Sequence, residues 1–341
     1  MAAAGLTGAS RWQELSLESE ALRGNPLGDP AERPLFVWTP PAYDTEPNRR
    51  FPVVYLLHAM TGQARAWFNV SPFARSVPEE IEALDPGAVV VLVDGWTALG
   101  GSQWIDSPAI GRYGTYLCDD VVGLVDARFR TLASPEHRAL AGRSSGGFGA
   151  MVWSMLRPDL FGGFATHAGD ALFELVYPAE FGAAAQALRN LYGGSFDRFW
   201  EDLRSGRPVF ANRTDPVLQN VYAAAAAFSP GGDGGVDLPF RIDTGELVPE
   251  VWARWLAWDP VRLARERGEE LRAARAIWID AGRGDEYCLD LGATAFHEAL
   301  LAAGVDPGVV HFELHEGGHR GTNWRLPLSL AFLAERLGPA A

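Results

Sequence analysis

The stretch Arg138-Ala139-Leu140-Ala141-Gly142-Arg143-Ser144-Ser145-Gly146-Gly147 decides the fold of this chain. It begins as a short apolar strand and leads into a helical run over 148–156. A serine between glycines at such a strand-to-helix turn is typical of a nucleophile elbow, whose sharp turn exposes the hydroxyl. The glycines avoid clashes with the neighbouring strand and helix, and the free N–H groups of the helix start face the reacting oxygen. The spacing places Ser144 at the apex, with Ser145 as the rival nucleophile.

Continuous apolar runs bounded by Gly or Pro recur along the chain, as is typical of strands buried on both faces of a sheet. The runs lie at 52–57, 88–93, 138–141, 163–167, 276–279 and 309–314, after two shorter strand patterns at 12–17 and 35–39. Helical patterns at 119–129, 147–156, 293–303 and 326–337 separate them. This alternation predicts an α/β fold with a mostly parallel central sheet and helices on both faces.

One interval breaks this alternation. About 100 residues separate the strand that ends at His167 from the strand that starts at Ala276, which is too long for a simple crossover. We therefore predict a single domain over 1–341, with a large, mostly helical cap inserted at 171–275. Its many aromatic residues either pack the core of the cap itself or, in one or two cases, line a pocket.

Composition excludes several classes of function. The 341 residues carry 29 basic and 43 acidic side chains, a net charge of −14, which argues against nucleic acid and anionic membranes as partners. All basic residues are arginine, so no side-chain amine exists for Schiff-base or pyridoxal phosphate chemistry or for a P-loop.

The two cysteines, Cys118 and Cys288, form no C-x-x-C pair and are typical of a reducing, cytoplasmic compartment. Residues 1–11 show no signal peptide, and no run of 18 apolar residues predicts a membrane span.

The general base should follow the nucleophile and the acid in the chain, which leaves four histidines. His297 lies in a helical pattern, whereas His311 and His315 lie on the last strand. His319 follows two glycines in the loop beyond that strand, where functional groups collect in open α/β sheets, so we predict His319 as the base. The spacing of four between His311, His315 and His319 would fit a zinc site on a helix, but this segment favours a strand, so we predict no metal.

The acid should follow the strand 276–279, within Asp280-Ala281-Gly282-Arg283-Gly284-Asp285-Glu286-Tyr287. It must reach the histidine, hold one tautomer and stabilise the imidazolium. Loop position favours Asp285, with Glu286 second, and Asp280 is expected to accept bonds from loop N–H groups.

The oxyanion of an acyl-transfer reaction needs two donors. One is the N–H of Ser145, and the other should come from the loop His58-Ala59-Met60-Thr61-Gly62. His58 is either a functional loop residue or merely the end of a strand. Arg143, Trp96 and Trp104 are candidate substrate contacts, although each has a structural alternative.

Together these motifs resemble the putative-esterase family of α/β hydrolases, which includes esterase D or S-formylglutathione hydrolase, mycolyltransferases, feruloyl esterases and enterochelin esterases. The resemblance covers about 35–337 without most of the cap and rests on five segments: 52–58, 94–95, 142–147, 280–287 and 317–319. It implies the α/β-hydrolase fold, Asp285 as the acid of a triad, and the N–H of Met60 as the second oxyanion donor.

The expected function is that of a serine esterase, which cleaves a small-molecule carboxylic ester through a catalytic triad and an acyl-enzyme, with no cofactor. Acyl transfer to an alcohol or amine is the alternative, as are a thioesterase and a non-catalytic binding protein. Thr61-Gly62 replaces the Thr-Cys of formylglutathione hydrolases, which disfavours a glutathione thioester. The sequence leaves open whether the chain forms a homo-oligomer.

Overall fold

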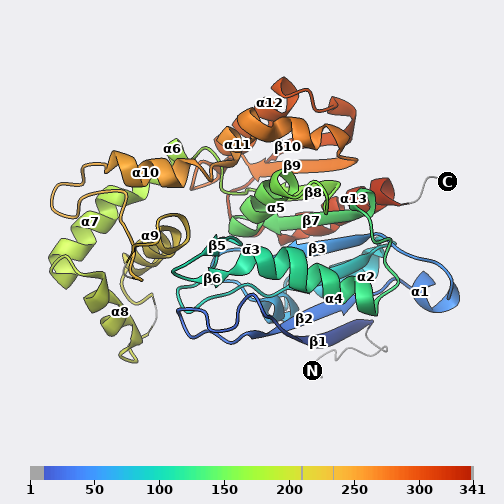
Figure 1. The fold of residues 1–341 in the computed structure, drawn as a ribbon, viewed down its shortest axis with the longest axis horizontal. Helices are drawn as coiled ribbons and strands as arrows, with labels where there is room; N and C mark the ends of the chain where they lie inside the picture. Colours follow the sequence, from blue (N-terminus) through green and yellow to red (C-terminus); the bar gives the residue numbers. More distant parts are fainter. Residues whose placement is uncertain (1–10, 209, 233, 339–341) are drawn as a thin grey trace.

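The computed structural model describes residues 11–208, 210–232 and 234–338. The segment 1–11, in which no signal peptide is predicted, lies outside these residues except for Arg11. The main sheet has eight strands in the order β1-β2-β4-β3-β7-β8-β9-β10 (Figure 1). They span Trp12–Glu18 (β1), Glu32–Trp38 (β2), Val53–Leu57 (β3), Val89–Val93 (β4), Arg138–Arg143 (β7), Gly163–His167 (β8), Ala276–Gly282 (β9) and Val310–His315 (β10). β2 pairs antiparallel with β1 and β4, and every other neighbouring pair is parallel. The predicted mostly parallel α/β fold is confirmed.

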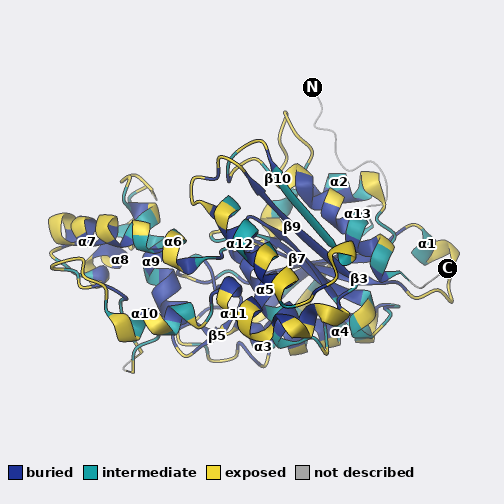
Figure 2. Cartoon of the chain, turned by 90° about the horizontal axis from the view of Figure 1, so that it is seen from above, coloured by how far each residue is buried: buried dark blue, intermediate teal, exposed yellow. Residues whose placement is uncertain are grey.

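Helices cover both faces of this sheet, and the strands appear buried between them in Figure 2. Successive side chains of a strand point to opposite faces, so Val53, Tyr55 and Leu57 of β3 join one core while Val54 and Leu56 join the other. The first core includes α4 (Val122–Arg128), α5 (Ser145–Leu156) and α12 (Leu289–Ala302). The second includes α2 (Val77–Leu84) and α13 (Leu326–Leu337). Short helices α1 (Ala42–Thr45) and α3 (Tyr113–Thr115), and a two-stranded ribbon of β5 (Asp106–Ser107) and β6 (Gly111–Arg112), complete the first half of the chain.

Between β8 and β9 the described residues form six α-helices: α6 (Phe173–Val176), α7 (Pro178–Tyr192), α8 (Phe196–Arg204), α9 (Asp215–Phe228), α10 (Pro249–Leu256) and α11 (Pro260–Arg267). Helices α7 to α10 extend beyond one end of the sheet, whereas α11 contacts α5 and α12 (Figure 1). The segment that stands off the sheet, which we call the cap, is therefore 173–258, shorter than the predicted 171–275 because α11 packs with the helices that cover the sheet.

Aromatic rings form most of the core of the cap. Phe181 stacks on Phe240 at 5.0 Å between ring centroids and meets the edge of Trp255 at 5.7 Å. Phe228 joins this cluster to the sheet layer, because its ring lies 5.6 Å from that of Phe148 in α5. Aromatic pairs at such distances stabilise a core beyond the area they bury, so these rings hold the cap against the layers around the sheet.

A single carboxylate joins the beginning of the cap to its end. Asp259 accepts hydrogen bonds from the backbone N–H groups of Leu172 and Phe173 at 3.0 and 3.2 Å, and from that of Val261 at 3.1 Å. The side chain is fully buried, and burial raises its pKa to about 6. The cap thus leaves and rejoins the core at one point.

Among the described helices, none combines the length and the apolar character that crossing a bilayer would require.

Candidate active site

Ser144 lies at a strained turn between β7 and α5. Its backbone has φ 54° and ψ −125°, a positive φ that non-glycine residues rarely adopt, and it forms the N-cap of α5. Two glycines make this turn feasible. A Cβ on Gly142 would lie 2.3 Å from the carbonyl carbon of Gly146, and a Cβ on Gly146 would lie 2.2 Å from the carbonyl oxygen of Leu57. The sequence interpretation of this segment as an elbow agrees with this geometry.

His319 and Asp285, from the loops after β10 and β9, form a hydrogen-bonded pair. His319 Nδ1 lies 2.9 Å from Asp285 Oδ2, and both side chains are buried. The other oxygen of Asp285 accepts from the backbone N–H groups of Tyr287 and Leu289, which fixes the carboxylate in its loop. His319 and Ser144 line the same pocket. An Nδ1–H donated to the carboxylate leaves Nε2 as the free proton acceptor of the ring.

The two other acidic candidates have different partners. Glu286 accepts a 2.7 Å hydrogen bond from the backbone N–H of His319, and that bond lowers the pKa of Glu286. Asp280 accepts from the side chains of His167, Trp278 and Arg325 at 2.7–2.8 Å, rather than from loop N–H groups as expected. Burial alone would raise the pKa of Asp280, but these partners outweigh it and hold the pKa below its ordinary value.

The remaining histidines of the last strand do not converge with His319. The ring of His311 stacks on Trp278 at 3.7 Å, and His315 Nδ1 bonds to the carbonyl oxygen of Glu316. Within 11–208, 210–232 and 234–338, no three His, Cys, Asp or Glu side chains gather as a metal site would require.

The backbone N–H groups of Met60 and Ser145 have no hydrogen-bond acceptor among the described residues. Met60 lines the pocket beside Ser144, and Ser145 is the first residue of α5, where N–H groups lack helical partners. The two amides predicted to bind an oxyanion are therefore both available as hydrogen-bond donors.

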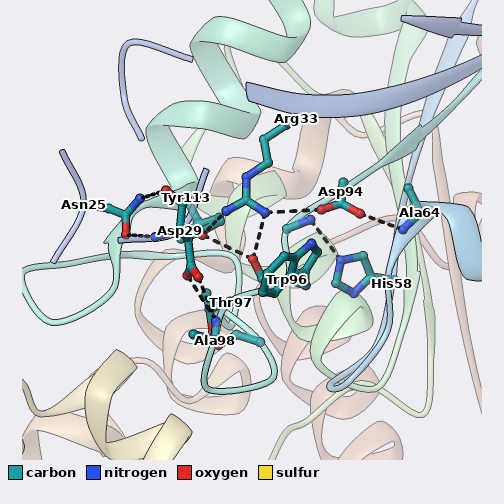
Figure 3. Close-up of polar contacts among 12 residues, drawn as sticks. Asn25, Asp29, Arg33, His58, Ala64, Asp94, Trp96, Thr97, Ala98 and Tyr113 are labelled. Atoms are coloured by element: carbon teal, nitrogen blue, oxygen red, sulfur yellow. Dashed lines mark hydrogen bonds and ion pairs between the residues drawn. The ribbon is translucent and has the colours of Figure 1, made fainter. Parts of the chain in front are cut away.

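His58 holds the loop that carries Met60. Its Nε2 accepts a 2.9 Å bond from the backbone N–H of Gly95 (Figure 3). Its Nδ1–H donates to the carbonyl oxygen of Ala59 at 2.9 Å. This pattern requires a neutral ring, and burial lowers the pKa of His58 accordingly. The indole N–H of Trp104 donates to the carbonyl oxygen of His58 at 3.1 Å.

A buried ion pair between Arg33 and Asp94 also supports this loop, as Figure 3 shows. Asp94, which directly follows β4, accepts from the backbone N–H of Ala64 at 3.0 Å and lies 3.4 Å from Arg33 Nη1. Arg33 also donates to the hydroxyl of Tyr113 and to the carbonyl oxygen of Trp96. The cluster thus joins β2, β4 and the loop after β3.

Of the four expected substrate contacts, only Arg143 lines the pocket, and its guanidinium donates to the carbonyl oxygen of His319. His58, Trp96 and Trp104 are absent from the pocket lining, and Trp104 is 1% exposed. The expectation that these three contact substrate disagrees with their position, because His58 and Trp104 bond to backbone groups and Trp96 lies beside Arg33.

The pocket has a volume of about 690 Å³. The loop regions after β3, β7 and β8 contribute to it, as do α6, α7 and α9 of the cap. Four of its polar residues went unnoticed in the sequence: Asp170, Tyr177, Glu180 and Asn220. Asp170 could have been found by its position just after β8, the strand beside the nucleophile strand, where ligand-binding groups collect.

A mostly parallel sheet with a serine on a strained turn between strand and helix defines this protein as an α/β hydrolase. Within that class it belongs to the putative esterase family, whose model matches residues 30–334. The resemblance seen in the sequence motifs is confirmed.

Individual relatives agree with this membership. An esterase of Mycobacterium tuberculosis is 30% identical over 205 residues, which are 57% of this chain and 42% of that protein. An uncharacterized protein of Corynebacterium glutamicum is 29% identical over 170 residues, 49% of this chain and 38% of that protein. The chain thus matches about two fifths of the length of each of these curated relatives.

Two solved structures share the fold over nearly the whole chain. A ferulic acid esterase has a TM-score of 0.59 at 18% identity and covers 96% of this chain and 98% of its own. An S-formylglutathione hydrolase from Agrobacterium tumefaciens has a TM-score of 0.57 at 18% identity, with 97% and 98% covered.

Proposed function

We propose that the protein hydrolyses a carboxylic ester, with Ser144 as nucleophile, His319 as general base and acid, and Asp285 as the residue that orients His319. The observation that carries the proposal is the convergence of a strained elbow serine and a carboxylate-bound histidine on one pocket. Membership of an esterase family supports the same reaction.

In the proposed first step, Ser144 Oγ forms a bond to the carbonyl carbon while His319 Nε2 takes the hydroxyl proton. The tetrahedral oxyanion accepts hydrogen bonds from the N–H groups of Met60 and Ser145, which are free and fixed before substrate binds. Collapse of this intermediate breaks the bond to the alcohol oxygen, which leaves with the proton from His319. The product of this step is an acyl-enzyme on Ser144.

Water then attacks the acyl-enzyme by the same route. His319 takes a proton from the water as the new carbon–oxygen bond forms, and it returns the proton to Ser144 Oγ when the acid leaves. Asp285 stabilises the imidazolium in both steps and holds Nδ1–H toward itself, so that Nε2 faces the reaction.

The direct test is turnover of p-nitrophenyl esters of rising acyl length, together with feruloyl esters and sugar acetates, and covalent labelling by a fluorophosphonate. We expect hydrolysis of at least one ester and labelling that is lost in Ser144→Ala. A chain that neither hydrolyses any ester nor reacts with the probe would contradict the proposal.

His58→Ala should lower kcat by about 10- to 100-fold and leave KM within about threefold, because loss of a single oxyanion donor already costs about 10²–10³-fold. The side chain touches Gly95 and Ala59 rather than the pocket, so its loss releases the loop of Met60 without removing a substrate contact. Steady-state kinetics with one p-nitrophenyl ester, compared with thermal unfolding of both proteins, measures this. A rise in KM at unchanged kcat would instead identify His58 as a substrate contact.

A further inference from the structure

One side of the active-site pocket is built from hydrogen-bond acceptors. Asp170 and Glu180, with Tyr177 and Asn220 as their partners, form what we call the acidic wall. Asp170 Oδ1 lies 3.5 Å from Ser144 Oγ, and Asp170 Oδ2 accepts from the hydroxyl of Tyr177 at 3.3 Å. Glu180 Oε2 accepts from the side-chain amide of Asn220 at 2.6 Å. The wall therefore starts at the nucleophile and continues along α7 and α9 of the cap.

Neither carboxyl of the wall forms an ion pair with a described residue, although the charge of His319 in the same pocket lowers the pKa of Asp170. Within the described part of the chain, no arginine or histidine forms an ion pair with Asp170 or Glu180, although most acidic side chains of the buried core have such a partner. The hydrogen bonds from Tyr177 and Asn220 are neutral, so each carboxylate retains acceptor capacity and uncompensated charge.

Burial disfavours the charged forms of both Asp170 and Glu180. Burial raises the pKa of Asp170 to about 6 and that of Glu180 to about 7, and the charge of Asp170 contributes to the rise at Glu180. Partly buried carboxylates without a cation cost stability in the empty enzyme, and a positively charged ligand removes that cost.

The arginines of the pocket do not fill this role. Arg143 donates to the carbonyl oxygen of His319, and Arg320 is exposed. Both line the pocket with His319, yet neither contributes to the pKa of either wall carboxyl.

We propose that the ester substrate carries an organic cation, an ammonium group that the acidic wall binds while Ser144 attacks the carbonyl. The proposal rests on the proposed esterase function and names its substrate class. The position of Asp170 beside Ser144 places the cation within a few bonds of the ester group. The same charges disfavour esters that carry a carboxylate or phosphate on this side.

The test compares esters that match in shape and differ in charge. The first pair is p-nitrophenyl 4-(trimethylammonio)butanoate against p-nitrophenyl 5,5-dimethylhexanoate, which place the group on the acyl side. The second pair is butanoylcholine against 3,3-dimethylbutyl butanoate, which place it on the alcohol side. A quaternary ammonium keeps its charge at every pH and cannot attack the ester. We expect kcat/KM to favour the cation by at least about tenfold in one pair, because the trimethylammonium charge is attracted to the wall carboxylates in a partly buried pocket.

Variants of the wall test the cause of that preference. Asp170→Asn with Glu180→Gln keeps an acceptor for Tyr177 and Asn220 but removes both charges, so the kcat/KM ratio of the favoured pair should approach one. The ratio is the readout, because it is independent of any general loss of rate. Glu201→Gln removes an exposed carboxyl of α8 and should leave the ratio unchanged.

The ratio should also rise with pH. Both carboxyls gain charge as pH increases through about 6 and 7, so the preference for a permanent cation should be weak near pH 5 and full near pH 8. Titration of catalytic groups affects both members of a pair and cancels in the ratio. The titratable and charged groups that face the wall or share its pocket are Tyr177, Asp285, Tyr287, His319, Arg143 and Arg320.

A ratio near or below one in both pairs would overturn the proposal, as would a preference that survives the double variant. A stronger, wall-dependent preference for sugar esters over both pairs would show that the wall binds hydroxyl groups, which also overturns it. Failure of the esterase function itself is distinct, because then the neutral esters would not be hydrolysed either.

Discussion

Ser144→Ala should lower kcat for ester hydrolysis by about 10⁴-fold or more, because the members of a triad act as a unit and only binding and the oxyanion donors remain. The backbone of the elbow is set by the glycines around it, and alanine at this position adds no atom, so the fold should be retained. Rates with the best p-nitrophenyl ester and circular dichroism of both proteins measure the two parts of the prediction.

Ser145→Ala is the matched control. Its proposed role uses only the backbone N–H, which alanine keeps, so the rate should stay within about tenfold of the unaltered protein. If Ser145→Ala abolishes turnover and Ser144→Ala does not, the elbow has been assigned in the wrong register.

Asp285→Asn should lower kcat by up to about 10⁴-fold, as expected when the oriented tautomer of the base is lost. The carboxylate accepts from His319 Nδ1 at 2.9 Å, and an amide there both removes the charge that stabilises the imidazolium and can donate to Nδ1. Asparagine can still accept from the backbone N–H groups of Tyr287 and Leu289, so the loop should keep its shape. The kcat and the thermal midpoint separate the two effects.

Two neighbouring acids serve as controls for Asp285. Glu286→Gln should stay within about tenfold, because an amide oxygen can still accept from the backbone N–H of His319. Asp280→Asn removes one charge from a buried pair with Arg325, which keeps Glu313 as its second partner, so it should lower the thermal midpoint rather than the rate of folded enzyme. Near-full activity of Asp285→Asn with collapse in Glu286→Gln would transfer the role of the acid to Glu286.

Local sequence patterns were sufficient to predict the strands of the sheet and the residues that directly follow them. The apolar run before Gly142 became β7, and the run before His319 became β10, because buried parallel strands need continuous apolar sequence. The positions of Ser144, Asp285 and His319 follow from these strands, since the ends of parallel strands meet at one edge.

Side-chain destinations could not be predicted in the same way. The sequence is compatible with His58 as a strand end or as a functional loop residue. Only the pairing of β3 with β4 in the folded sheet brings His58 to Gly95. The limit of the cap at α11 also depends on packing, because an amphipathic helix has the same pattern on either side of that border. The acidic wall joins Asp170 and Glu180 to Asn220, which lies 40 residues from Glu180 in sequence and meets it only through helix packing.

The bond pattern of Asp259 has a consequence for how this protein can diversify. The Asp259 carboxylate binds the backbone of Leu172 and of Phe173, which lies 86 residues earlier in the chain. The two ends of the cap are therefore adjacent. Insertions, deletions or replacement of the whole cap should leave the distance between β8 and β9 in the sheet unchanged. Changes in the length or sequence of the cap can therefore occur without displacing the loops that carry Ser144, Asp285 and His319.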